Sequence, residues 1–415
     1  MLTGFSSGLP LYVLISLLSA YLREGGVDLK SIGLMSLVQI PYIWKFLWSP
    51  LCDRYGLANL WGRAAGFGRR RSWMLGAQLV LLAAIPAFGW FSPQPDLKSI
   101  MVLAFVVAFF SATQDIAIDA FRRELLRDEE LGLGNVVHVN AYKIAGLVPG
   151  SLSLILADHL PWSSVYFITA LFMLPGIGLS LWMGEPPASR SAPRSLRDAV
   201  IEPLHEFLRR KGWRSALAIL AFIFLYKLGD SMATSLATPF YLDLGYSKSE
   251  IGLVAKHAGL WPSVIGGILG GVWMVSLGIQ RALWIFGAVQ ALVILGFAWL
   301  AEAEHTLWGL AGVIGAEAFG VGLGTAAFVA YIASATHPAY TATQFALFSS
   351  LAATPRTLAN ACTGFLVEGG DLSWLGTGIH FMGLGWTRFY WFCFAAAIPG
   401  MVLLLKIAPW DGERE

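Results

Sequence analysis

The sequence predicts an all-α integral membrane protein whose twelve transmembrane helices form two six-helix bundles. Three observations predict this fold class: a low charge content, a series of apolar stretches of spanning length, and a repeat on either side of a basic linker. Of the 415 residues, 56% are hydrophobic and only 13% are charged. A soluble domain carries about 25% charged residues because its surface faces water. Large soluble chains split into domains rather than becoming more apolar, so most of this surface must face lipid.

Apolar windows of about 20 residues, the length that a spanning helix needs, follow one another along the chain. They cover residues 3–22, 32–50, 72–92, 99–121, 136–157, 163–183, 215–240, 250–274, 281–301, 306–334, 342–367 and 387–408. Helices fit better than strands, because every backbone polar group must be satisfied inside lipid and alternating ten-residue segments are absent. The first window begins at residue 3 without a signal-peptide cleavage pattern, and we expect a short cytoplasmic leader to be missing ahead of it.

A polar stretch at 184–214 separates the sixth window from the seventh. Its basic residues are Arg190, Arg194, Arg197, Arg209, Arg210, Lys211 and Arg214. Residues 196–210 have the composition of a short amphipathic helix at the membrane surface, but a plain linker is the preferred interpretation. The sequence thus predicts an N-terminal six-helix bundle at 1–183, a cytoplasmic linker at 184–214 and a C-terminal six-helix bundle at 215–415.

The positions of Lys and Arg in short loops predict the orientation of the chain. One side carries the basic linker together with Arg54, Arg63, Arg69, Arg70, Arg71, Arg122, Arg123 and Arg127. The other side carries mainly Arg23, Lys30, Lys98 and Lys248, which acidic neighbours offset. Because basic loops stay in the cytoplasm, we expect both termini and the linker to be cytoplasmic.

The two predicted halves contain related segments. Residues 22–34 (LREGGVDLKSIGL) resemble residues 242–253 (LDLGYSKSEIGL), and each segment closes the first span of its half and opens the second. A repeat of six spans on either side of a basic linker is typical of a transporter whose halves rock against one another. A channel or a receptor does not need such a repeat.

Ionisable side chains inside a span are costly unless they face a cavity or a partner, so each is a functional candidate. The N-terminal half has Lys45, Asp115, Asp119 and Lys143. The spacing of the two aspartates places them on one helix face, about 6 Å apart. Two carboxylates so close in a low dielectric favour the binding of a proton. Proton or substrate coupling is one interpretation, and a static salt-bridge cluster is the other; Asp115 and Asp119 are the candidates for proton coupling.

The C-terminal half adds further charged residues nearer the middle of their spans. These are Lys227, Asp230, Glu317 and Arg356. Uncharged side chains that can hydrogen bond a polar ligand are Tyr12, Gln39, Tyr42, Gln114, Tyr142, Tyr226, Gln344 and Asn360. We expect these charged and uncharged residues of both halves, together with Lys45 and Lys143, to form the substrate-binding site.

The residue types that enzymes use do not cluster in this sequence. None of His138, His159, His257, His305, His337 and His380 belongs to a nucleophile or metal set. The cysteines Cys52, Cys362 and Cys393 lack metal-ligand spacing and are interpreted as small buried hydrophobic residues. We therefore expect no enzyme activity, no metal and no cofactor. The net charge of +2 argues neither for nor against nucleic acid, but the basic residues lie in short loops rather than on one face, and we expect no nucleic-acid partner.

One loop carries a motif. Residues 50–56 (PLCDRYG), followed after an insertion by residues 68–71 (GRRR), resemble the signature between the second and third spans of the major facilitator superfamily. In that signature the aspartate caps the end of a neighbouring helix and pairs with arginines. The resemblance implies the major facilitator fold and a gate role for Asp53, Arg54, Arg69, Arg70 and Arg71. The insertion leaves the arginine partner of Asp53 open.

Several stretches in order resemble the AmpG family of muropeptide permeases, over nearly the whole chain. They are residues 4–11 (GFSSGLPL), 45–51 (KFLWSPL), 114–116 (QDI), 119–120 (DA), 281–287 (RALWIFG), 324–330 (GTAAFVA) and 342–347 (ATQFAL), with Arg356 downstream. The resemblance implies a monomer in the bacterial inner membrane. It also implies proton-driven import of N-acetylglucosaminyl-1,6-anhydro-N-acetylmuramic acid, with or without its peptide, for peptidoglycan recycling and β-lactamase induction.

Other interpretations stay open at this point. Acetyl-CoA transporters share the stretches around Lys45 and Asp115, so another anionic solute such as acetyl-CoA is the alternative cargo. The later stretches at 281–287 and 342–347 favour muropeptides. A drug exporter tolerates fewer buried charges than this chain has.

Overall fold

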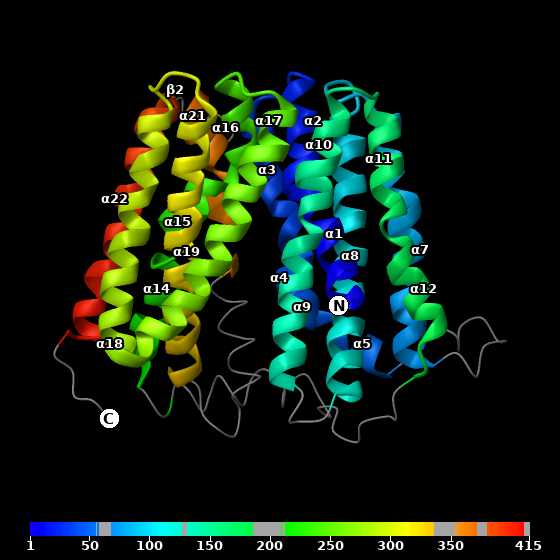
Figure 1. The fold of residues 1–415 in the computed structure, drawn as a ribbon, viewed down its shortest axis with the longest axis horizontal. Helices are drawn as coiled ribbons and strands as arrows, with labels where there is room; N and C mark the ends of the chain where they lie inside the picture. Colours follow the sequence, from blue (N-terminus) through cyan, green and yellow to red (C-terminus); the bar gives the residue numbers. More distant parts are fainter. Residues whose placement is uncertain are drawn as a thin grey trace. The chain divides into compact units, whose positions relative to one another are not determined.

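The computed structural model describes residues 1–54, 56–57, 68–126, 131–185, 209, 212–335, 353–354, 356–371 and 380–410. Within these ranges the chain is almost wholly helical (Figure 1). The described strands are β1 (Gly369–Asp371) and β2 (His380–Met382), which pair antiparallel with Gly370 opposite Phe381. The amphipathic-helix alternative for 196–210 concerns residues that, apart from 209, lie outside these ranges.

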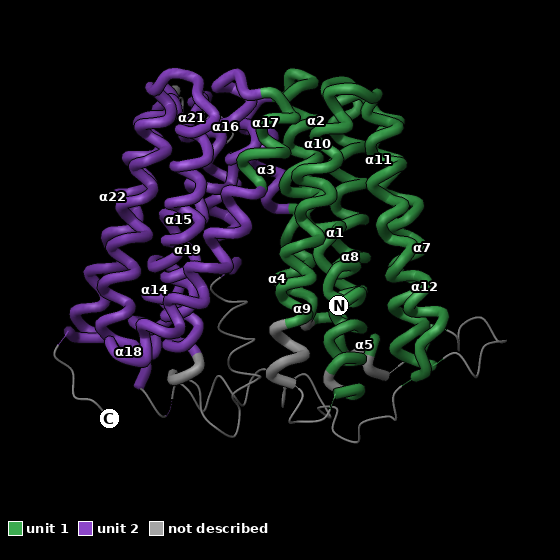
Figure 2. The backbone as a smooth tube through the Cα atoms, in the orientation of Figure 1, with its two compact units in different colours: residues 1–27, 38–192, 247–256 green, residues 28–37, 193–246, 257–415 purple. Residues whose placement is uncertain are grey.

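The chain packs as two compact units, coloured separately in Figure 2. Unit 1 consists of residues 1–27, 38–192 and 247–256. Its helices are α1 (Leu2–Tyr12), η1 (Val13–Leu17), α2 (Leu18–Glu24), α4 (Ile40–Trp44), η3 (Lys45–Leu47), α5 (Ser49–Arg54), α7 (Arg69–Ala87), η4 (Phe88–Trp90), α8 (Leu97–Leu125), α9 (Leu131–Ala145), η5 (Val148–Leu152), α10 (Ser153–Ala157), α11 (Trp162–Leu171), α12 (Leu174–Trp182), α17 (Lys248–Glu250) and η7 (Ile251–Ala255).

Unit 2 consists of residues 28–37, 193–246 and 257–415. Its helices are α3 (Leu29–Leu34), α14 (Trp213–Leu225), α15 (Leu228–Ser235), α16 (Ala237–Asp243), most of α18 (Lys256–Leu300), α19 (Leu307–Ala335), α21 (Thr363–Glu368) and α22 (Gly385–Ile407), and η2 (Met35–Gln39) runs from unit 2 into unit 1. Its core contains Phe222, Phe286, Leu323 and Leu404, all at most 2% exposed.

Two short segments pack away from their own half of the sequence. Residues 28–37 belong to unit 2, where the Leu29 amide donates to the Glu368 carboxylate at 2.9 Å. Residues 247–256 belong to unit 1, where Gly252 packs on the Ser151 carbonyl. The predicted bundle boundaries at 183 and 215 therefore stay a prediction, because each of these two segments packs with the other half of the sequence.

Most predicted spans are long helices, and nine helices in the described ranges have the length and composition to cross a membrane. One of them, Lys248–Leu300, contains two predicted spans, since Gly278 breaks it with a non-helical φ of 77°. The predicted span 32–50 is instead a succession of short α and 3₁₀ pieces, and Pro41 lies in the first turn of α4. Much of 342–367 lies outside the described ranges.

The helices of unit 1 run alternately up and down. At one end Trp162 Nε1 donates to Glu24 at 2.8 Å and the Tyr21 hydroxyl donates to the Phe91 carbonyl. At the other end Arg70 Nη2 donates to Glu124 at 2.7 Å. The ends of neighbouring helices therefore alternate, as expected for sequential membrane spans.

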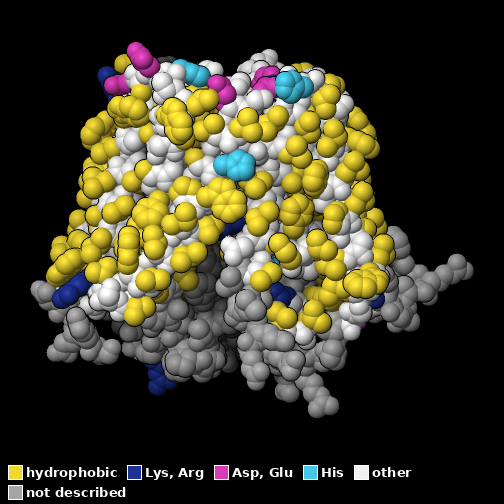
Figure 3. All heavy atoms as spheres, viewed as in Figure 1, with side chains coloured by type: hydrophobic (Ala, Val, Ile, Leu, Met, Phe, Trp, Pro, Cys, Tyr) yellow, Lys and Arg dark blue, Asp and Glu magenta, His cyan; other side chains and the backbone are white. Residues whose placement is uncertain are grey.

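The surface agrees with burial in lipid. Hydrophobic side chains cover the middle of the face in Figure 3, with acidic and histidine side chains along the upper rim. Trp90, Trp182 and Trp308 lie at helix ends and are 77%, 87% and 90% exposed. Tryptophan is enriched at the membrane–water interface, where its ring is apolar and its N–H can reach water.

Close approach of α1 and α9 depends on two glycines. A Cβ at Gly4 would overlap the His138 carbonyl oxygen, and one at Gly8 would overlap the Tyr142 carbonyl oxygen. Small residues at such interfaces let membrane helices pack by van der Waals contact, since lipid gives no hydrophobic driving force between them.

We predict that Gly8→Val lowers the melting temperature of the purified protein in detergent. The added atoms meet backbone that cannot move aside, and overpacking of this kind costs about 1–3 kcal/mol. Gly178→Val is the matched control, since a Cβ at Gly178 has nothing within 4 Å. Equal melting temperatures for the two variants would contradict this account of the α1–α9 contact.

Candidate functional site

The two aspartates of α8 have different partners. Asp115 accepts a hydrogen bond from Ser7 Oγ of α1 at 2.5 Å. Asp119 pairs with Lys45 Nζ at 3.4 Å and with Arg122 Nη2 at 3.1 Å. Within the described part of the chain, no ion pair reaches Asp115. The two carboxylates are thus one turn apart, but only Asp119 has cations within ion-pair distance, while Asp115 is hydrogen-bonded to a hydroxyl and interacts with the Lys45 charge from farther away.

Two tyrosines lie near Asp115, and a third packs against one of them. The rings of Tyr12 and Tyr142 are 5.8 Å apart, and Tyr42 and Tyr142 lie close enough to Asp115 to interact with its charge. The Tyr42 hydroxyl is buried without a hydrogen-bond partner among the residues described. Lys143 is half-buried on α9 and forms no ion pair within the same ranges. The structure therefore brings Lys45, the two aspartates and the three tyrosines together.

Two predicted binding residues of the N-terminal half have other surroundings. Gln114 is fully buried, and its Nε2 donates to the Ser6 carbonyl at 2.8 Å. Gln78 also donates to Ser6, so this polar network joins α1, α7 and α8. Gln39 is half-buried at the end of η2. The Gln114 amide nitrogen thus contributes to helix packing.

The arginines predicted as a gate and described by the structure lie in the first turn of α7, at one end of unit 1. Arg70 makes a bidentate pair with Glu124, and both side chains are 7% exposed. Arg69 lies 3.8 Å from the same carboxylate, and Arg71 donates to the Leu181 carbonyl at 2.6 Å. The side chains of Asp53 and Arg54 lie outside the described part of the structure.

A carboxylate that the sequence argument missed caps α7. Glu185 accepts from the backbone amides of Arg70 at 2.6 Å and Arg71 at 3.1 Å, in the first turn of the helix. Free amides and the helix dipole make that position favourable for a negative charge. No local sequence pattern identifies Glu185, because it is distant from α7 in the chain.

The charged residues of unit 2 also meet in one cluster. Lys227 Nζ lies 3.7 Å from Asp230, and Glu317 of α19 lies beside Asp230. Arg356 is near enough to Asp230 to interact with its charge. Lys227 and Glu317 are 6% and 8% exposed, so this cluster lies inside the helices of unit 2.

Three other predicted residues of the C-terminal half vary in their roles. Tyr226 is 5% exposed, stacks on Phe328 and donates to the Leu283 carbonyl at 3.1 Å, so it belongs to the core of unit 2. Asn360 and Ser231 share a hydrogen bond at 3.0 Å. Gln344 lies outside the described residues.

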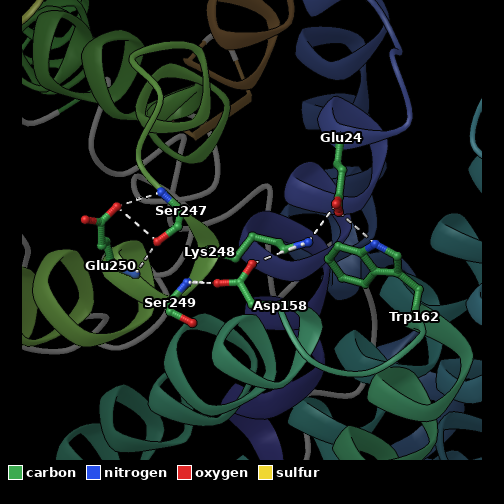
Figure 4. A network of polar contacts seen from close by, with 7 residues as sticks. All are labelled: Glu24, Asp158, Trp162, Ser247, Lys248, Ser249 and Glu250. Carbon is green, nitrogen blue, oxygen red and sulfur yellow. Dashed lines mark hydrogen bonds and ion pairs between the residues drawn. The ribbon is translucent and has the colours of Figure 1, made fainter. Parts of the chain in front are cut away.

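A second polar network lies at the other end of unit 1 (Figure 4). Lys248 Nζ lies 2.6 Å from Glu24 and 3.6 Å from Asp158, while the Ser249 amide donates to Asp158 at 2.6 Å. Trp162 donates to the same Glu24. These contacts attach the first turn of segment 247–256 to the ends of α2, α10 and α11.

The sequence argument treated the members of this network as ordinary loop charges. It also missed Lys256, although a lysine between apolar residues was a visible signal, and Arg122, which was assigned to a loop. In the part of the chain that the structure describes, no group of three His, Cys, Asp or Glu residues is arranged to hold a metal ion.

Comparison with known proteins identifies the fold and the relatives of the chain. Residues 1–360 match the model of the Major Facilitator Superfamily. A nucleoside transporter superposes with a TM-score of 0.74 at 12% identity over 98% of each chain. A D-xylose–proton symporter superposes with a TM-score of 0.68 at 14% identity, over 100% of this chain and 97% of the other. At such low identity these likenesses show the fold alone.

Closer relatives come from curated bacterial proteins. An uncharacterized protein of Haemophilus influenzae is 46% identical over 99% of this chain and 94% of its own length. The anhydromuropeptide permease of Escherichia coli is 39% identical over 98% of this chain and 78% of its own length. A Rickettsia felis protein that carries the AmpG name is 30% identical over 97% of this chain and 94% of its own length.

The protein is a multi-pass membrane transporter of a small molecule and not an enzyme, as the sequence predicts. On the full-length matches together with the fold, the chain belongs to the major facilitator superfamily and, within it, to the AmpG family.

Proposed function

We propose that this protein imports anhydromuropeptides, the disaccharide N-acetylglucosaminyl-1,6-anhydro-N-acetylmuramic acid with or without its peptide, from the periplasm to the cytoplasm. The observation that carries the proposal is the 39% identity to the Escherichia coli anhydromuropeptide permease over 98% of this chain. The buried charges of both units suit such a cargo, which brings carboxylates, hydroxyls and amides. Import would serve peptidoglycan recycling and the induction of β-lactamase.

The α8 cluster supports coupling of this import to protons. Asp115 is hydrogen-bonded to the Ser7 hydroxyl and, among the described residues, has no cation within ion-pair distance, so a neutral, protonated side chain fits its surroundings. Asp119 instead forms ion pairs with Lys45 at 3.4 Å and with Arg122 at 3.1 Å, and its side chain is 48% exposed. We therefore assign proton binding to Asp115 first, with Asp119 as the alternative. Lys45 is also near enough to Asp115 for their charges to interact, so a proton on Asp115 weakens the attraction of the two aspartates for Lys45, which then becomes free to bind cargo.

The orientation follows from the distribution of charge. The end of unit 1 that carries Arg69, Arg70 and Arg71 is assigned to the cytoplasm, with both chain termini. The end that carries Lys248 and Glu24 is then periplasmic, in the inner membrane of a bacterium. We propose that the transporter works as a monomer.

The cargo is tested by uptake of radiolabelled anhydro-disaccharide, with and without its tripeptide, into energised right-side-out membrane vesicles. We predict accumulation that a protonophore abolishes, because the proton gradient supplies the free energy. Vesicles without the protein are the control. If the folded, inserted protein takes up neither compound, the proposed cargo is wrong and other anionic solutes, such as acetyl-CoA, become the candidates.

The coupling residue is tested by substitution. We predict that Asp115→Asn abolishes uphill accumulation while downhill exchange of labelled cargo continues, because the amide fills the same space but carries no titratable proton. Asp119→Asn is measured in parallel. Uphill uptake that survives in both variants would remove these aspartates from the coupling mechanism.

A further inference from the structure

Lys256 is a half-buried cation of unit 1 whose role is not explained by the α8 cluster. It lies where η7 meets α18, and its Nζ donates to Ser16 Oγ of η1 at 2.8 Å. Ser16 is 2% exposed. Among the residues that the structure describes, no carboxylate lies within 4.0 Å of Nζ, the distance of an ion pair.

Three other lysines of the described chain have acidic partners, whereas Lys143 on α9, like Lys256, has none within ion-pair distance among the described residues. Lys45 pairs with Asp119, Lys227 with Asp230, and Lys248 with both Glu24 and Asp158. A lysine inside a membrane protein is costly unless a partner or a water-filled cavity compensates its charge. A neutral serine hydroxyl compensates it only in part, so an anionic ligand is the partner that this position lacks.

The backbone around Lys256 is specialised. Three π-helical turns meet here, because η5 contacts both η1 and η7. Such turns are rare, and they occur frequently at functional sites. Gly150 lies in η5, where a Cβ would come within 2.6 Å of Lys256 Cε. The absence of a side chain at Gly150 thus makes the space that the lysine stem occupies.

A row of aromatic and small residues leads from Lys256 toward Asp115. Tyr142, Gly146 and Gly150 follow one another at intervals of four residues. The Tyr12 ring covers Gly146, at 3.0 Å from a Cβ built there, and Tyr12 also contacts Tyr142. Aromatic faces beside hydrogen-bonding groups suit a sugar ring, and Lys256 stands at the end of this row.

We propose that Lys256 binds a carboxylate of the cargo, with Ser16 as the second hydrogen-bond donor. This inference rests on the proposed function. Anhydromuropeptides always carry such a group: the lactyl carboxylate of the muramic acid when the peptide is absent, and the peptide carboxylates when it is present. On binding, the Lys256 ammonium exchanges its hydrogen bond to Ser16 for one to the carboxylate, and the Ser16 hydroxyl donates to the same anion.

The test is a cycle that changes the protein and the ligand separately. Binding of the peptide-free disaccharide acid and of its lactyl carboxamide is measured by calorimetry on purified protein in lipid nanodiscs. We expect the wild type to prefer the acid by about tenfold or more, the effect of a charge-assisted hydrogen bond. Lys256→Gln should abolish the preference while binding the carboxamide as the wild type does, and Lys256→Arg should retain it.

Lys248→Gln is the matched control, because Lys248 belongs to the same segment but already has two acidic partners. Changes in conformational equilibrium affect acid and carboxamide alike, so this variant should keep the preference for the acid. The proposal is overturned if Lys256→Gln keeps that preference, or if it loses affinity for both ligands equally, which would indicate a packing role. Failure of the wild type to bind either ligand would refute the proposed cargo, and this assignment with it.

Discussion

The low dielectric of the membrane is the constraint on which the rest of this structure depends. It excludes unpaired backbone groups, which is why the described chain is almost wholly helical. It also makes an isolated charge costly, and the ion pairs follow from that. Arg70 and Glu124 illustrate the result: both side chains are 7% exposed, and they form a bidentate pair. Lys256 departs from this pattern, because its described partner is a serine hydroxyl.

The same constraint gives identical residue types different chemistry. Asp115 and Asp119 are one turn apart on α8, yet Ser7 faces the first while Lys45 and Arg122 face the second. Asp115 has a hydroxyl of α1 as its hydrogen-bond partner, whereas Asp119 has two cations within ion-pair distance and a side chain that is 48% exposed. The two aspartates therefore differ in their surroundings and not in residue type.

The related segments at 22–34 and 242–253 have related fates in the structure. Each leads into a short helix that packs away from its own half of the sequence: α3 in unit 2 and α17 with η7 in unit 1. Glycines make these contacts close, since a Cβ at Gly252 would come within 2.7 Å of the Ser151 carbonyl oxygen. The weak sequence repeat thus corresponds to two related segments, each of which packs in the unit formed mainly by the other half of the sequence.

The sequence by itself determined the membrane class, most helix positions and the family, because apolar windows of spanning length and ordered motifs are local signals. It also identified Asp115, Asp119, Lys45 and the unit 2 charges as candidates, since any charge in an apolar window is conspicuous. Only the tertiary structure decided which partner each charge has: that Ser7 reaches Asp115, that Glu185 caps α7 and that Lys256 meets Ser16. These partners are up to 240 residues apart in the chain, and side-chain contacts across helices leave no trace in local periodicity.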